Sequence, residues 1–145
     1  MLWKLFVAFA LMATCVVIHA SSVTSALRWL RMHGTMSAQL PYLSRIWLFV
    51  RIAAWIILFH LVEIAVWATF YWWQGAMPDL PAALYFSAVT YTTTGYGDLV
   101  LPADWRLVGG VEALTGILMC GWSTGFFFAV VSRLEWAPQA NAPRV

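Results

Sequence analysis

Residues 91–98 read Tyr-Thr-Thr-Thr-Gly-Tyr-Gly-Asp, and this short stretch decides how the chain on either side of it is interpreted. Gly95 and Gly97 permit the positive φ angles that residues with a Cβ disfavour. A backbone that uses such angles can turn successive carbonyls toward one axis, and the Thr93 hydroxyl can add a further oxygen. The alternative is a glycine-tyrosine turn in an ordinary loop, so the flanking residues have to distinguish the two.

The flanking sequence favours a membrane setting. Pro81 suits the first position of a helix, and residues 81–92 make about three helical turns. Long apolar segments over 46–73 and 106–134 lie on either side, and each can cross a bilayer. The predicted order is therefore a crossing helix, a short re-entrant helix, the 93–98 segment and a second crossing helix.

This order resembles the pore module of potassium channels, whose selectivity filter has the pattern T-x-G-Y-G-D. Residues 93–98 match every specified position, and Thr94 stands where the family usually has valine or isoleucine. The resemblance implies an all-α membrane protein that forms a homotetramer around a central pore, because each chain supplies one pore loop. It also implies a filter that binds potassium through the carbonyls of Thr93, Thr94, Gly95 and Tyr96, with Gly97 completing it.

The resemblance also identifies residues that support the filter. Val89 occupies a position where some bacterial members carry a glutamate that is hydrogen-bonded to the filter aspartate. The matching aspartate here is Asp98, and Tyr85 is its expected partner. Filter stability is therefore expected to depend on Tyr85 and Asp98.

The predicted inner helix, 106–134, contains two candidate gating hinges. Gly116 lies at about the spacing from the filter at which the family bends this helix. An inferred one-residue insertion near Pro102 shifts the register, so Gly121 is the alternative. Gly121 also begins a G-x-x-x-G motif, which more often marks helix packing.

Composition agrees with a membrane protein. The 145 residues are 63% hydrophobic and only 10% charged, and the net charge of +2 is too small to indicate a nucleic-acid partner. Cys15 and Cys120 lie in apolar segments and are expected to be buried and unpaired. No nucleophile–base pair or phosphate loop is present, so we expect no enzyme and no cofactor other than potassium ions.

Residues 1–24 predict an additional N-terminal transmembrane helix or, alternatively, a cleaved signal peptide. Cleavage would turn the filter toward the cytoplasm, so we prefer a retained helix with its N-terminus outside the cell membrane. Residues 25–45 contain arginines but no acid and predict a cytoplasmic connector. Within them, residues 25–32 form either a short interfacial helix or the end of the first helix. Residues 135–145 form a short cytoplasmic tail.

His60 and Glu63 lie on one face of the predicted helix over 46–73. Ionisable groups at membrane depth are costly unless they face protein or water. They are interpreted as a proton-sensitive site or as a structural pair hydrogen-bonded to a neighbouring helix. Glu112 is a second acid inside a predicted crossing helix, and we expect it to have a partner within the subunit.

The sequence as a whole predicts a potassium-selective channel in the cell membrane, through which potassium diffuses passively. Its expected partners are further copies of itself and the lipid bilayer. The alternatives are a weakly selective cation channel on the same scaffold and an accessory subunit that forms no pore alone. The sequence contains no arginine-repeat voltage sensor, and the tail is too short for a ligand-binding domain.

Overall fold

The computed structural model describes residues 2–33 and 40–135, and regular structure in these ranges is entirely helical. The helices are α1 (Leu2–Met32), α2 (Tyr42–Trp73), α3 (Leu80–Tyr91), the one-turn helix η1 (Ala103–Trp105) and α4 (Arg106–Glu135). Three helical segments are long and apolar enough to cross a membrane, namely α1, α2 and the continuous η1–α4 segment. The predicted tail beyond Glu135 and the middle of the predicted connector lie outside the described residues.

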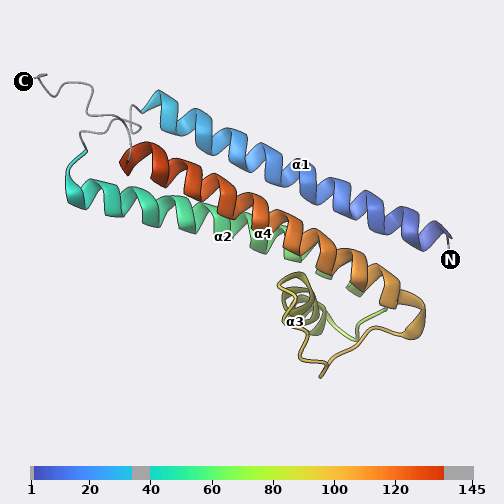
Figure 1. The fold of residues 1–145 in the computed structure, drawn as a ribbon. Helices are drawn as coiled ribbons and strands as arrows, with labels where there is room; N and C mark the ends of the chain where they lie inside the picture. The colour runs from blue at the N-terminus through green and yellow to red at the C-terminus, as the bar shows by residue number, and fades with distance from the viewer. Residues whose placement is uncertain (1, 34–39, 136–145) are drawn as a thin grey trace, which may run out of the picture.

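The three long helices run side by side, while α3 lies at the end of the bundle where α1 begins (Figure 1). α3 packs mainly against α2 and also contacts α4. The loops on either side of α3 lie at the same end as the N-terminus. Helix α4 ends at the opposite end, beside the C-terminal end of α1 (Figure 1).

Helix α1 continues to Met32 instead of ending near residue 24 as predicted. Residues 20–32 contain neither glycine nor proline, so no residue interrupts the backbone hydrogen bonds of the helix. Of the two alternatives for residues 25–32, the end of the first helix is therefore correct, and a separate interfacial helix is not formed. Helix α2 likewise begins earlier than predicted, at Tyr42 directly after Pro41.

Two apolar clusters hold the bundle together. The larger one lies around α3 and includes fully buried Trp67, Tyr71 and Met119. The smaller one joins the other ends of the long helices and consists of Leu30, Leu48, Ile52, Phe126, Val130 and Leu134. Buried apolar area stabilises by roughly 25 cal/mol per Å² in water, but in a bilayer close packing replaces that driving force.

Polar contacts attach α1 to the rest of the chain at both ends. The Lys4 ammonium lies 3.4 Å from the Asp104 carboxylate and 4.3 Å from the centre of the Trp105 ring. At the opposite end, the Arg51 guanidinium lies 4.6 Å from the centre of the Trp29 ring. Cation–π contacts of this kind contribute roughly 0.5–2 kcal/mol each. α1 is therefore fixed against both the η1 region and α2.

The cysteines differ in environment. Both are unpaired, and Cys15 is buried, as predicted. Cys120 is exposed in the single chain, so the prediction of burial is wrong for this residue. It borders an open groove between α2 and α4.

Candidate functional site

Helix α3 determines where the 93–98 segment begins. The Asp79 carboxylate accepts a hydrogen bond from the backbone N–H of Ala82 at 2.8 Å, which caps the first turn. Pro81 lies in that first turn, where its missing N–H costs no hydrogen bond. α3 therefore starts at Leu80 and ends at Tyr91, one residue earlier at each end than the sequence predicted.

The backbone after α3 uses the left-handed region at alternate residues. Gly95 has φ of 58° and Gly97 has φ of 78°, as their residue types allow. Thr93 also has a positive φ, 59°, which sequence analysis did not anticipate. An L-residue with a Cβ is strained in this region by about 1–2 kcal/mol. The surrounding hydrogen bonds must therefore hold Thr93 in place.

Those hydrogen bonds join N–H groups of the segment to carbonyl groups in the last turn of α3. The Thr93 N–H donates to the Thr90 carbonyl at 2.9 Å. The N–H groups of Thr94 and Gly95 both donate to the Val89 carbonyl, at 2.9 and 3.2 Å. The backbone N–H groups at the start of the segment thus attach it to α3.

The carbonyl oxygens of the same segment remain open. Among residues 2–33 and 40–135, no hydrogen bond ends on a carbonyl oxygen of residues 93–97. Backbone carbonyls almost always have a partner in folded proteins. These oxygens are therefore available to water, to an ion or to another chain.

Tyr85 and Asp98 form the contact that the sequence predicted. The Tyr85 hydroxyl donates to the Asp98 carboxylate at 2.7 Å and links α3 to the chain beyond Gly97. This hydrogen bond favours the ionised form and lowers the pKa of Asp98 below its ordinary value. The Asp98 carboxylate therefore holds the C-terminal end of the 93–98 segment against α3.

We expect Tyr85→Phe to raise the pKa of Asp98 toward its ordinary value, because the main cause of the lowered pKa is removed. The contact that lowers a carboxyl pKa stabilises the fold at every pH above the ordinary pKa of the group. This stabilisation is lost as the pH falls through the lowered pKa. Because Tyr85→Phe removes the hydroxyl donor, the variant should lack the hydrogen bond to Asp98 at neutral pH as well as in acid. Carboxyl NMR titration of both proteins measures the shift, and identical Asp98 titration curves would contradict this prediction.

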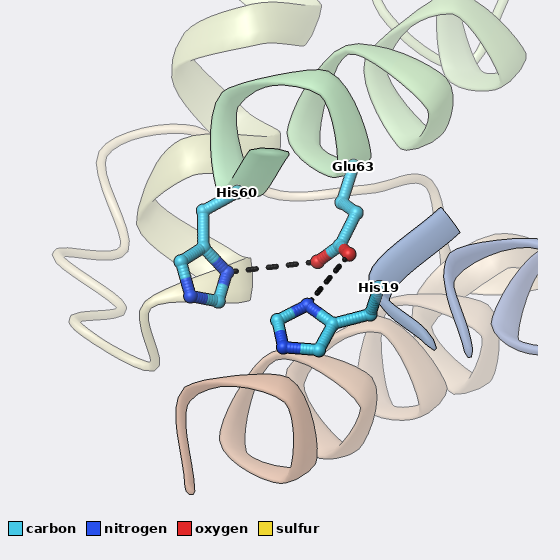
Figure 2. Close-up of side chains that lie close together, drawn as sticks. All are labelled: His19, His60 and Glu63. Carbon is cyan, nitrogen blue, oxygen red and sulfur yellow. Dashed lines mark hydrogen bonds and ion pairs between the residues drawn. The ribbon is translucent and has the colours of Figure 1, made fainter. Parts of the chain in front are cut away.

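A second group of polar side chains lies behind α3, inside the bundle. His60 and Glu63 of α2 are joined there by His19 of α1, with both imidazoles directed at the Glu63 carboxylate (Figure 2). The Nδ1 atom of His19 lies 3.0 Å from Glu63 Oε1, and Nδ1 of His60 lies 3.6 Å from Oε2. Tyr91 of α3 donates its hydroxyl proton to Glu63 Oε2. Ser123 of α4 contacts Nε2 of both histidines, at 3.0 and 3.1 Å.

These five side chains, which we call the polar cluster (His19, His60, Glu63, Tyr91 and Ser123), connect all four α-helices. His19 is 2% exposed and Glu63 is completely buried. Of these five residues, only His60 and Glu63 were predicted from the sequence. An imidazole in the apolar run of α1 was a signal that could have identified His19, whereas nothing in the sequence distinguished Ser123. The contacts agree with the structural interpretation of the pair, and proton sensitivity stays a prediction.

The two candidate hinge glycines have different surroundings. A Cβ added to Gly116 would lie 1.8 Å from the Tyr91 carbonyl oxygen, so α4 packs directly on the end of α3 at this point. A Cβ added to Gly121 would meet no atom within 4 Å. α4 is one continuous helix through both positions. Close packing therefore explains the glycine at 116, and the hinge stays a prediction.

Glu112 is completely buried in α4, and the hydroxyls of Tyr71 and Ser87 lie beside it. These neighbours come from α2 and α3 of the same chain. Within the described residues, however, neither carboxylate oxygen of Glu112 and neither of these hydroxyls makes a hydrogen bond, so a partner for Glu112 stays a prediction.

Together, three helical segments long and apolar enough to cross a membrane indicate an integral membrane protein, in which the short helix α3 precedes a segment with open carbonyls. Comparison with protein families gives the same class in finer terms, because a family profile described as "Ion channel" matches residues 45–133. The chain belongs to this ion-channel family, which is a family of channels and not of enzymes. No curated protein and no solved structure matches the chain.

Proposed function

We propose that this ion channel is selective for potassium and that residues 93–97 form its filter. The proposal is supported mainly by the different hydrogen bonding of the backbone N–H and carbonyl groups in this segment. The N–H groups of Thr93, Thr94 and Gly95 are bound to α3, while the carbonyls of the segment have no partner among the described residues. Closely spaced carbonyl oxygens replace the hydration shell of potassium. The Thr93 hydroxyl adds a ligand at the inner side.

The proposal includes a homotetramer, because one chain carries one loop and a filter on an axis needs several loops related by rotation. In that assembly α3 is the pore helix, and its C-terminal end points toward the ion path. The negative end of the helix dipole favours a cation there. The lipid bilayer surrounds the assembly, and potassium ions in the filter are the only bound species we propose.

Charge distribution supports a cell-membrane topology with the N-terminus outside. The end of the bundle that carries the α3 loops holds the acids Asp79, Asp98 and Asp104 (Figure 1). Most of the described cations lie toward the other end, on the ends of α1, α2 and α4: Arg28, Arg31, Arg45, Arg51 and Arg133. Cytoplasmic segments of membrane proteins carry such an excess of arginine. The packing of α1 on α4 and α2 supports its retention as a transmembrane helix.

Reconstitution of the purified protein into vesicles tests the proposal. We expect passive potassium flux down a gradient and a reversal potential, with potassium and sodium on opposite sides, close to that of potassium. A reversal potential near zero would favour the weakly selective cation channel. An intact tetramer without flux would favour the accessory subunit.

The outer mouth allows a separate prediction about block by external tetraethylammonium. Val100 is 64% exposed and lies just beyond Asp98, at a position where four aromatic rings would form a collar in the proposed tetramer. An aromatic face attracts a quaternary ammonium by roughly 0.5–2 kcal/mol per contact. We expect weak block of the wild type and a clearly higher affinity in Val100→Tyr. Strong block of the wild type that Val100→Tyr leaves unchanged would show that this residue does not line the mouth.

A further inference from the structure

We propose that His19, His60 and Glu63 form a binding site for a divalent first-row transition-metal ion that ties α1 to the channel domain. Two imidazoles and one carboxylate are a donor set suited to zinc and to ferrous iron. Their ligand atoms all lie within 4.8 Å of one another. The inference goes beyond conduction, and it holds or fails independently of the filter assignment.

The separations between the ligand atoms suit one shared ion. Zinc lies about 2.0–2.2 Å from nitrogen and oxygen ligands, so two tetrahedral ligands are roughly 3.3–3.6 Å apart. Here His19 Nδ1 lies 3.0 Å from Glu63 Oε1 and His60 Nδ1 lies 3.6 Å from Glu63 Oε2, and the three ligand atoms of the set lie within 4.8 Å of one another. Small rotations of the imidazoles would therefore place both Nδ1 atoms and the carboxylate around an ion. Figure 2 shows both rings presenting these atoms to Glu63.

The outer partners hold the ligands as a metal site requires. Metal-binding histidines usually use their second nitrogen in a hydrogen bond that fixes the ring. Here Nε2 of both His19 and His60 is within hydrogen-bond distance of the Ser123 hydroxyl oxygen, which has two lone pairs. With an ion bound, that oxygen would accept from both Nε2 atoms, and the lone pairs of both Nδ1 atoms would face the ion. Tyr91 holds that carboxylate through its hydroxyl.

The hydrogen bonds of the cluster leave a place for a cation between His19 and Glu63. Tyr91 donates its hydroxyl proton to Glu63, so the Tyr91 oxygen can accept from His60 Nδ1, which lies 3.1 Å away. His60 Nε2 can then accept from Ser123, which can accept from His19 Nε2. In that arrangement His19 Nδ1 and Glu63 Oε1, 3.0 Å apart, are two acceptors that face each other unless a proton or a metal ion lies between them. A bound ion would take that place.

An ion has a route to this centre from one side. A groove of about 330 Å³ between α2 and α4 is bordered by His60 and Ser123. The third histidine, His33, is exposed near the other end of α1 and stacks on Trp29. It therefore provides a matched control for histidine substitutions.

The test uses the full chain, purified without a histidine tag, stripped with a chelator and loaded with Zn²⁺ or Co²⁺. We expect one ion per chain, about one proton released per ion in weak buffer, and a higher melting temperature. His19→Asn and Glu63→Gln should abolish this stoichiometric binding, while His33→Asn should retain it. Ser123→Ala should weaken affinity about 10–100-fold, as is usual for outer partners.

A second variant addresses the case in which the substitutions prevent folding. His19→Cys keeps a ligand, so the Co²⁺ protein should bind one ion and acquire a thiolate-to-cobalt charge-transfer band. Absence of stoichiometric Zn²⁺ and Co²⁺ binding by the folded wild type would overturn the proposal. Unchanged binding by folded His19→Asn would overturn it as well. Flux measurements do not enter this test, so failure of the metal site and failure of the channel assignment are distinguishable.

Discussion

Gly116→Ala should abolish ion flux and lower the melting temperature of the protein. The added Cβ would lie 1.8 Å from the Tyr91 carbonyl oxygen and 2.7 Å from the carbonyl carbon. Both contacts are with backbone atoms, so no side-chain rotation can relieve them, and α4 must move away from the end of α3. Overpacking in a tight interior costs roughly 1–3 kcal/mol and occasionally more. Residues 92–94 follow Tyr91 directly, so the displacement reaches the proposed filter.

Gly110→Ala is the matched control for this substitution. Gly110 lies on the same helix, and an added Cβ there meets no atom within 4 Å. Alanine also has the higher helix propensity, so this variant should melt no lower than the wild type. Thermal unfolding in detergent and flux from vesicles compare the two variants with the wild type. Wild-type flux and stability in Gly116→Ala would show that α4 does not pack on the end of α3.

Gly97→Ala should abolish potassium flux or admit sodium. Gly97 has φ of 78°, a conformation that costs an L-residue about 1–2 kcal/mol. An added Cβ at Gly97 has open space, so the cost comes from the backbone angle and not from a clash. Relaxing that angle rotates the adjacent peptide and turns its carbonyl away from the proposed ion path. In a homotetramer the change occurs in every subunit at once.

Gly75→Ala separates a filter effect from general backbone strain. Gly75 also has a positive φ, 64°, and open space for a Cβ, but it follows α2 outside the 93–98 segment. Its replacement should cost similar stability and leave the potassium-to-sodium permeability ratio unchanged. Bi-ionic reversal potentials measure that ratio in both variants. If Gly97→Ala kept the wild-type ratio, residues 93–97 would not be the filter.

The sequence alone determined those features that depend on local chemistry. Apolar runs of sufficient length predicted the crossing helices, and Pro81 placed the start of α3 within one residue. Gly95 and Gly97 predicted positive φ angles, because only glycine adopts them without strain. The resemblance to the potassium-channel pore module predicted the hydrogen bond between Tyr85 and Asp98. The ion-channel family, too, was recognised from this motif and its flanks.

Tertiary structure decided what depends on residues distant in the chain. His19 and Glu63 meet only because α1 packs against α2, and Ser123 reaches both histidines because α4 lies beside them. No local sequence pattern predicts contacts between residues so far apart in the chain. The constraint at Gly116 likewise arises from the approach of Tyr91. A sequence shows that a glycine is present, but only the packed bundle shows which backbone atoms lie where its side chain would be.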